Sequence, residues 1–236
     1  HALMGENGAG KSTLMKVLYG IYIPDEGGEL ILDDKPFKPS RPIDAIRSGL
    51  TMVPQEISPA ANLTIADNFY LGREITLGKF FLNQKAMDEQ ASAILKDLGV
   101  PMDVTEKMSD VSVAKAQLVA IATAVSNDAK IIIMDEPTTA LTENEVEQLY
   151  RIIDTVKARG IAIIFISHKL DEVFRVSDEI TVIRDGQYVD TKPTKEVTKE
   201  QLISMMVGRD MSEMFQRERF ELSDEIILEI KNFTRE

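Results

Sequence analysis

A glycine-rich segment near the start of the chain has the composition and spacing of a phosphate-binding loop. Its residues 5–12 read Gly-Glu-Asn-Gly-Ala-Gly-Lys-Ser and fit the pattern G-x-x-x-x-G-K-[ST]. Glycines allow a backbone to wrap around a phosphate chain with its N–H groups inward, and a following helix directs its N-terminus at the anion. Lys11 is expected to reach the β- and γ-phosphates, and the Ser12 hydroxyl to bind Mg²⁺.

The loop residues expected to contact a nucleoside triphosphate form one continuous run. They are Asn7, Gly8, Ala9, Gly10, Lys11, Ser12 and Thr13. A plain glycine-rich turn before a helix is the alternative interpretation. The context favours phosphate binding, because a strand-like segment over residues 1–4 precedes the loop and a helical pattern from Lys11 to Tyr19 follows it.

Two adjacent acidic residues, Asp135 and Glu136, follow the apolar run Ile131–Met134, which is typical of a buried strand. A parallel strand beside the phosphate loop would place Asp135 near Mg²⁺, as the carboxylate that organises the metal. It would place Glu136 near the γ-phosphate, as the candidate general base for a water. Acids often follow strands for no catalytic reason, and the loop upstream is what favours the functional interpretation.

Two further polar side chains follow predicted strands. His168 comes after the apolar run Ile161–Ile166, and Gln55 comes after the short run Leu50–Val53. Because ligands bind at the carboxyl ends of strands in open α/β sheets, His168 is expected to contact the γ-phosphate. The Gln55 amide is expected to orient water and to bind Mg²⁺, whereas by itself a loop glutamine is usually only solvated.

Alternating strand and helix patterns must position these residues. A capping box at Thr142–Glu145 begins a helix that ends at Gly160, and the strand Ile161–Ile166 follows. This β-α-β order predicts a mainly parallel sheet with helices on its faces. An edge strand is expected over Glu29–Leu32, and an antiparallel hairpin with a type I′ turn is expected at Asp185-Gly186.

Residues 56–111 read as a helical insertion into this alternation. Helical patterns over Ile65–Tyr70 and Gln84–Leu98 are separated by proline, glycine and methionine. A further apolar helix is expected over Val113–Val125, before the strand that carries the two acids.

The composition excludes several other classes of site. The 236 residues carry a net charge of −12, which argues against broad binding to nucleic acid or to an anionic membrane. The absence of cysteine excludes disulfides, thiolate zinc sites and Fe–S clusters, and the only histidines are His1 and His168, which excludes a multi-histidine metal site. No apolar run approaches the roughly 20 residues that span a bilayer.

Together these segments resemble the nucleotide-binding domain of ABC ATPases over nearly the whole chain. The phosphate loop is similar to Walker A, Val53–Glu56 to the Q-loop, Ile131–Glu136 to Walker B, Pro137–Thr142 to the D-loop and His168 to the switch histidine. The resemblance implies a P-loop NTPase fold of α/β class, with a mainly parallel sheet, a small antiparallel β element and an inserted helical subdomain.

The resemblance also implies ATP and Mg²⁺ as ligands and assigns roles to individual residues. The implied catalytic residues are Lys11, Glu136 and His168. The implied metal ligands are Ser12, Gln55 and, through water, Asp135.

The signature helix of the family is expected after the insertion, where this chain departs from the general pattern. It reads Val111-Ser112-Val113-Ala114-Lys115 in place of Leu-Ser-Gly-Gly-Gln. Ser112 still makes a suitable N-cap, whereas Val113 and Ala114 narrow the approach to the backbone and Lys115 sits unfavourably in the first turn unless an anion offsets its charge. The signature acts across a dimer in this family, so Ser112 is expected to contribute to the ATP site of the partner.

Four segments resemble more narrowly the ATP-binding subunits of monosaccharide importers of the ribose/galactose/xylose type. They are Ser112–Ala114, Thr142, Ser167–Val173 and Met205–Arg209. Those subunits carry two nucleotide-binding domains in one polypeptide. This chain is therefore expected to be most of the first domain, without its initial strands and its adenine-stacking aromatic residue.

The implied organisation has four parts. They are an ATPase core over residues 1–55 and 112–190, a helical subdomain over 56–111, a linker over 191–225 and the opening strand of a second nucleotide-binding domain over 226–236. The implied function is an ATP-hydrolysing motor subunit that energises sugar import from the cytoplasmic face of the cell membrane. Its implied partners are the second nucleotide-binding domain, an integral membrane permease and, indirectly, a sugar-binding protein, with no nucleic acid.

Three alternatives are weighed against this function. An ATPase of the same fold that acts on ribosomes or DNA would be expected to carry a long basic arm, whereas residues 191–225 hold six basic and eight acidic residues. A non-hydrolytic nucleotide-binding scaffold would be expected to have lost Glu136 or His168, and both are present. A P-loop kinase would not need the D-loop or the switch histidine.

Overall fold

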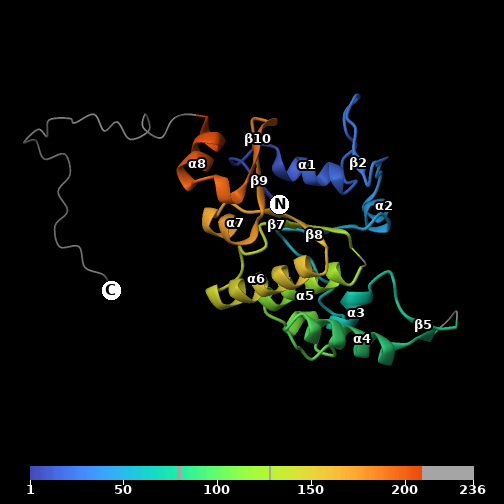
Figure 1. Cartoon of the computed structure of the whole chain (residues 1–236). Coiled ribbons are helices and arrows are strands. Elements are labelled where there is room, and N and C mark those ends of the chain that lie inside the picture. The colour runs from blue at the N-terminus through green and yellow to red at the C-terminus, as the bar shows by residue number, and fades with distance from the viewer. Residues whose placement is uncertain (79–80, 128, 209–236) are drawn as a thin grey trace, which may run out of the picture.

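The apolar runs predicted as strands pair in one six-stranded sheet in the computed structural model (Figure 1). The structure describes residues 1–78, 81–127 and 129–208. The strands, in spatial order, are β10 (Gln187–Pro193), β9 (Glu179–Arg184), β1 (Ala2–Met4), β8 (Ala162–Ile166), β7 (Ile131–Asp135) and β4 (Leu50–Val53). All neighbouring strands are parallel except β9 and β10, so the predicted α/β fold with a mainly parallel sheet is confirmed.

The register of the parallel strands aligns their carboxyl ends. Leu3 of β1 pairs with Ile166 of β8, and Ile166 also pairs with Asp135 of β7. Val53 at the end of β4 pairs with Met134. The loops that follow these four strands therefore leave the sheet at one edge, which is the edge where open α/β sheets bind ligands.

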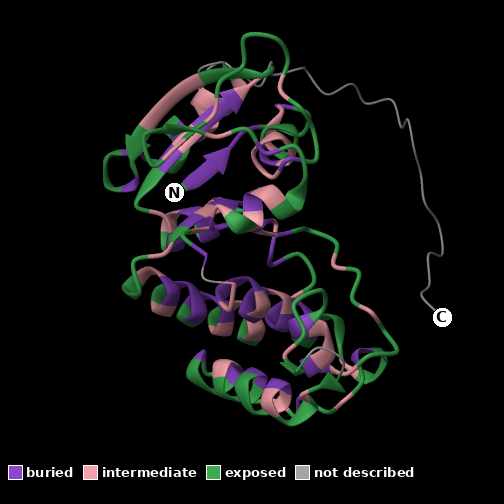
Figure 2. Ribbon diagram, turned by 90° about the vertical axis from the view of Figure 1, so that its right-hand side faces the viewer, coloured by how far each residue is buried: buried purple, intermediate pink, exposed green. Residues whose placement is uncertain are grey.

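Helices cover both faces of the sheet, because alternate strand residues point to opposite faces. The covering helices are α1 (Lys11–Leu18), α2 (Pro42–Arg47), α5 (Val113–Val125), α6 (Glu143–Ala158), α7 (Leu170–Val176) and α8 (Lys199–Val207). On β7, Ile132 and Met134 join the apolar cluster of α5 and α6, whereas Ile133 joins that of α1 and α2. Figure 2 shows the buried residues gathered in the sheet and on the helix sides that face it.

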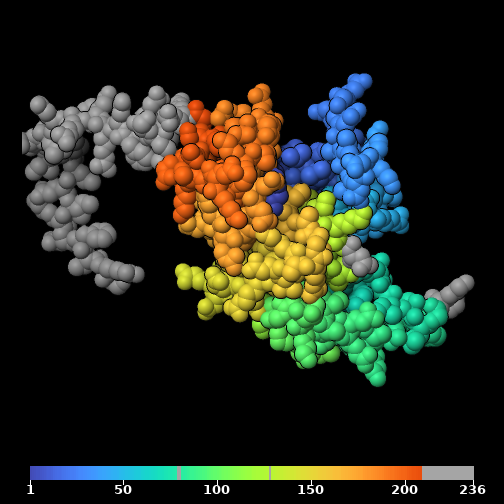
Figure 3. All heavy atoms as spheres, viewed as in Figure 1, coloured from blue at the N-terminus to red at the C-terminus, as the bar shows by residue number. Residues whose placement is uncertain are grey.

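The predicted helical insertion forms the lower lobe of the molecule (Figures 1 and 3). Its elements are α3 (Ile65–Tyr70), β5 (Thr76–Leu77), β6 (Phe81–Leu82), α4 (Gln84–Asp97) and the 3₁₀ turn η1 (Met108–Asp110). A capping box of Thr64 and Asp67 begins α3. Buried Phe69 and Leu95 of this lobe share one cluster with Ile121 of α5 and Ile132 of the sheet, so the insertion and the sheet have a continuous core.

The edge strand predicted over Glu29–Leu32 is shorter than expected and is not part of the main sheet. Only β2 (Ile31–Leu32) forms, and it pairs with β3 (Lys35–Pro36) in a small hairpin of its own rather than at the edge of the main sheet. Asp33 and Asp34 make the turn, with left-handed φ values of 51° and 59°. This is the backbone that a two-residue type I′ turn requires, and Asp tolerates it better than most residues.

The ordered fold continues past residue 190, where the sequence pattern predicts a linker. Strand β10 runs to Pro193, the 3₁₀ turn η2 (Thr194–Glu196) follows, and α8 then packs on the sheet. Leu202 of α8 is fully buried in a cluster with Val182 of β9. The boundary expected at residue 190 thus falls within β10, and the division of the chain into domains stays a prediction. The strand predicted over residues 226–236 lies outside the described residues.

Within the part of the chain that the structure describes, no helix has the length and apolar character needed to cross a membrane.

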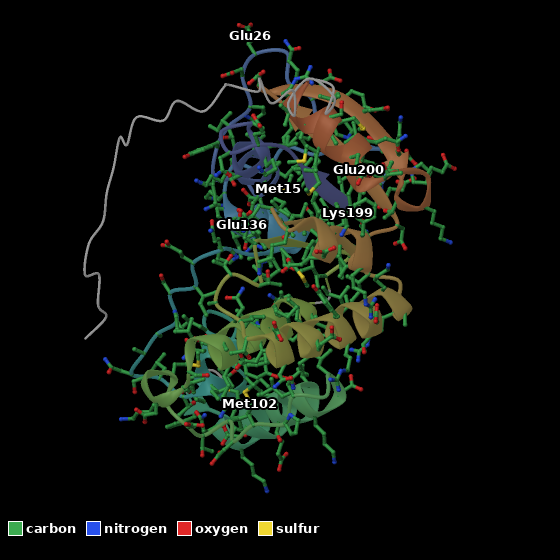
Figure 4. The ribbon with its side chains drawn as sticks, turned by 90° about the vertical axis from the view of Figure 1, so that its left-hand side faces the viewer. Met15, Glu26, Met102, Glu136, Lys199 and Glu200 are labelled. Carbon is green, nitrogen blue, oxygen red and sulfur yellow. The ribbon has the colours of Figure 1, made fainter. Side chains whose placement is uncertain are left out.

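The burial of Leu202 predicts that α8 contributes to folding stability. Leu202→Ala should lower the free energy of unfolding by about 2–5 kcal/mol, because it removes apolar contacts and leaves a cavity. Lys199→Ala is a matched control on the same helix (labelled in Figure 4), where only a surface ion pair with Asp171 is lost, at a cost of less than about 1 kcal/mol. Urea unfolding of both variants tests this, and equal effects would show that α8 is not part of the cooperative core.

Candidate functional site

The phosphate loop leaves β1 through a position that only glycine can occupy. A Cβ atom on Gly5 would lie 2.2 Å from the carbonyl oxygen of Ile183 in β9, well inside van der Waals contact. At the other end of the loop, Gly10 adopts a left-handed φ of 99° immediately before α1 begins at Lys11. The two glycines therefore set the close approach to β9 and the turn into α1.

A cavity of about 510 Å³ opens between this loop and the carboxyl ends of the neighbouring strands. Its lining residues are Asn7, Gly8, Gly10, Lys11, Ser12, Thr13, Gln55, Glu136, Ile166 and His168. Residues predicted from four separate motifs thus meet around one cavity, as the register of the sheet requires. Figure 4 shows Glu136 between Met15 of α1 and the lower lobe, which Met102 marks.

Lys11 turns back on its own loop. Its Nζ donates hydrogen bonds to the carbonyl oxygens of Gly5 at 2.8 Å and Glu6 at 3.0 Å. Burial lowers the pKa of Lys11, and the nearby carboxylates of Glu136 and Asp135 act in the opposite direction. The ammonium of Lys11 is therefore held by two carbonyl oxygens of the phosphate loop itself.

Asp135 is the buried acid of the site, with 7% of its surface exposed. Burial raises its pKa and the adjacent charge of Glu136 raises it further, while a hydrogen bond with the Ser12 side chain lowers it. Asp135 does not line the cavity itself but reaches it through this contact with Ser12. The carboxylate at the end of β7 and the hydroxyl in the first turn of α1 thus form a pair of hard oxygen ligands.

Glu136 is held in an unusual backbone conformation. Its φ is 46°, which is uncommon for a non-glycine residue, and its N–H donates to the carbonyl of Ile166 at 2.9 Å. Its Oε2 accepts a hydrogen bond from Gln55 Nε2 at 3.0 Å and lies 3.3 Å from His168 Nδ1. The side chain of Glu136 is 19% exposed and that of His168 is 58% exposed. Three predicted site residues are therefore in direct contact.

Besides Asp135, two predicted residues lie outside the cavity lining. The backbone of Ala9 is used within the protein, since its N–H donates to Glu6 and its carbonyl accepts from Gly186. Ser112 caps α5, where its Oγ accepts a hydrogen bond from the N–H of Lys115 at 3.3 Å. Neither contacts this cavity in the structure, and for Ser112 the expected site is on a partner rather than here.

Some residues of the site region were not predicted from the sequence. Ile166 lines the cavity, and a buried network of Thr138, Ser167 and Glu172 lies behind Glu136 and His168. Ile166 could have been identified, because it ends the strand that precedes His168. The network could not be inferred from the sequence, because Thr138 lies 34 residues before Glu172 and only the fold brings them together.

The chain is similar to sugar-import proteins over its full length. A relative from Geobacillus kaustophilus (strain HTA426), named for the import of ribose, galactose and methyl galactoside, is 45% identical over 236 residues, which is 100% of this chain and 46% of the relative. The galactose/methyl galactoside import ATP-binding protein MglA of Yersinia pestis bv. Antiqua (strain Antiqua) is 47% identical over 235 residues, which is 99% of this chain and 46% of the relative. The chain thus spans less than half the length of these relatives.

The fold is shared with solved ATP-binding cassettes. The ADP conformation of an ATP-binding cassette of an ABC transporter superposes with a TM-score of 0.73 at 26% identity, over 88% of this chain and 87% of that one. The model of a protein family described as ABC transporter matches residues 1–139, which is more than half of the chain. These findings confirm the expected resemblance, and the chain belongs to the ABC transporter family of nucleotide-binding domains.

Proposed function

We propose that this chain binds ATP with Mg²⁺ and hydrolyses it, as one ATP-binding half of a motor subunit that energises monosaccharide import. The observation that carries the proposal is the cavity in which the phosphate loop, Gln55, Glu136 and His168 meet. The transport part is supported by the names of relatives from two organisms, which are import proteins for galactose and related sugars. A location at the cytoplasmic face of the membrane, and the absence of a nucleic-acid partner, are part of the same proposal.

Nucleotide binding would require Lys11 to exchange partners. Its Nζ now donates to two carbonyl oxygens of its own loop, and the β- and γ-phosphates of ATP would accept these bonds instead. Burial disfavours the charged form of Lys11. A polyanion bound in the cavity would stabilise the ammonium, and this attraction would contribute to its binding energy. Asn7, Gly8, Ala9, Gly10 and Thr13 would complete the binding loop.

The donor set beside the loop suits Mg²⁺. Ser12 offers a hydroxyl, Gln55 an amide oxygen and Asp135 a carboxylate that would act through water, all of them hard oxygen ligands. The buried Asp135 carboxylate, whose pKa is raised, is a negative charge that a cation would compensate. When bound, Mg²⁺ would neutralise charge on the phosphates during transfer.

Hydrolysis would depend on Glu136 and His168. Glu136 would accept the proton of the water that attacks the γ-phosphate, as the general base. The bond from Gln55 Nε2 orients its carboxylate, and His168 would contact the γ-phosphate beside it. The left-handed backbone of Glu136 costs on the order of 1–3 kcal/mol, a strain that is common where a side chain must be aimed at a reacting group.

A second nucleotide-binding domain would complete each ATP site. Ser112 begins α5 away from the cavity of its own domain, and the neighbouring Val113 is 63% exposed. An exposed helix N-terminus of this kind suits contact with the phosphates of a partner's ATP. The organisation into an ATPase core, a helical subdomain, a linker from residue 191 and the start of a second nucleotide-binding domain is part of this proposal.

The permease would dock beside the segment that follows Gln55. A groove of about 240 Å³ lies there, between residues 54–59 on one side and α3, η1 and α5 on the other, and its apolar lining residues include Ile57, Met108 and Val119. A helix or loop of the permease bound in this groove would be displaced if Gln55 and the adjacent Pro54 moved on ATP binding. A sugar-binding protein would act only indirectly, through the permease.

The buried Asp135 predicts an unusual pH dependence of stability in the absence of nucleotide. Because its pKa is raised in the folded protein, the folded state binds this proton more tightly than the unfolded chain, and stability falls as pH rises through that interval. Asp135→Asn should therefore raise the free energy of unfolding at about pH 7, and the gain should shrink as the pH falls towards the ordinary aspartate pKa.

Urea unfolding over this pH range measures the effect, with the exposed Asp110→Asn as the control that should change little. A loss of stability for Asp135→Asn at every pH would contradict the argument, since the Ser12 contact would then outweigh the cost of burial.

Glu136→Gln should separate ATP binding from ATP turnover. The amide keeps the size of the side chain but cannot act as a base, so kcat should fall about 100-fold or more while nucleotide affinity is retained. Lys11→Ala is the contrasting variant, in which nucleotide binding itself should be lost. Binding of a fluorescent ATP analogue and release of phosphate, measured on the full-length protein, provide the two readouts.

Undiminished hydrolysis by Glu136→Gln at this site would remove Glu136 as the base. Normal nucleotide affinity of Lys11→Ala would remove the assignment of the phosphate loop.

A further inference from the structure

A buried carboxylate, Glu172 of α7, lies behind the proposed catalytic residues without lining their cavity. Only 5% of its surface is exposed. Its Oε2 accepts hydrogen bonds from Thr138 Oγ1 at 2.9 Å and from Ser167 Oγ at 2.8 Å, and its Oε1 lies 3.1 Å from Lys169 Nζ. The carboxylate therefore has partners for both of its oxygens.

The two hydroxyl groups come from the two loops that carry the chemistry. Thr138 is two residues after Glu136, and Ser167 immediately precedes His168. Each hydroxyl residue is only 2% exposed, and Ser167 Oγ also accepts the N–H of Lys169 at 3.0 Å. A single oxygen of Glu172 thus joins the loop after β7 to the loop after β8.

The energetics favour a fixed geometry at this point. A buried carboxylate is costly unless charged and polar partners compensate it, and hydrogen bonds to an ionised acceptor are about twice as strong as neutral ones. Neither loop can shift alone without leaving a buried oxygen short of a donor. The contact between Glu136 and His168, at 3.3 Å, is therefore backed by a second connection between the same loops.

We propose that Glu172 is a positioning residue that holds the Glu136 loop and the His168 loop at one separation, so that base and histidine reach the γ-phosphate together. The inference rests on the proposed ATPase function. Because Glu172 does not line the cavity, it acts on turnover through the two loops and not on the binding of ATP.

Two single variants and their combination test the shared role. Glu172→Ala removes the acceptor, and Thr138→Val removes one donor while keeping the shape of the side chain. Each should lower kcat about tenfold to a hundredfold with the KM for ATP unchanged, since small misplacements of reacting groups have effects of this size. The double variant should lose no more than the more impaired single variant, because both changes break one connection.

Conservative and matched controls separate positioning from general stability. Thr138→Ser keeps the hydroxyl and should restore turnover to near the original rate. Asp171→Asn removes an acid next to Glu172 on the same helix, where it pairs with exposed Lys199, and should leave kcat unchanged. Where Glu172→Ala does not fold, the comparison of Thr138→Val with Thr138→Ser decides the question by itself.

The assay uses the full-length protein with Glu136→Gln as its reference. Unchanged kcat per folded molecule in Thr138→Val and Glu172→Ala overturns the inference, as does a rise in KM alone or a double variant whose losses multiply. If Glu136→Gln does not lower kcat at this site in the same assay, the proposed function has failed instead.

Discussion

The register of the parallel sheet is the constraint on which the rest of the site depends. Leu3, Ile166 and Asp135 form one row across β1, β8 and β7, and β4 ends one residue before that row. Every loop with a chemical group therefore starts from the same edge. A shift of one residue in β7 would turn Asp135 and its neighbours to opposite faces, since strand side chains alternate. The buried isoleucines of β7 oppose that shift. Ile132 and Ile133 pack into different apolar clusters on the two faces of the sheet, and each would lose its packing partners.

This arrangement gathers charges that would be costly to bury separately. Lys11 lies near two carboxylates, yet its Nζ donates its hydrogen bonds to loop carbonyls, and a hydrogen bond with Ser12 partly offsets the burial of Asp135. The charged groups of the site thus have partners within the protein, and under the proposed function phosphate and Mg²⁺ would replace some of them. Gathering charged groups in one place lowers the stability of a fold, and binding sites commonly show this cost. The apolar clusters on both faces of the sheet offset that loss.

The local motifs and the main elements could be predicted because their signals are local. The phosphate loop, the acids after Ile131–Met134 and the helix over Val113–Val125 each depend on a few adjacent residues. The four-residue edge strand from Glu29 was predicted wrongly, since its pairing partner decided its length and place. The packing of α8 could not be predicted either, since it depends on a few core contacts such as that of Leu202. The network of Glu172 was out of reach, because Thr138 is 34 residues away from it in the chain. The roles of Ser112 and of the other site residues remain predictions that depend on ligands and on a partner domain.

The most direct test of the account is to identify what the full-length protein binds in membranes. The protein would be purified from detergent-solubilised membranes in the presence of ATP, with the Lys11→Ala variant as control, and its partners identified by mass spectrometry. The account predicts a polytopic permease, enriched with the ATP-binding protein, and a sugar-binding protein in smaller amount. Recovery of ribosomes or DNA-repair proteins with no membrane partner would contradict the transport function.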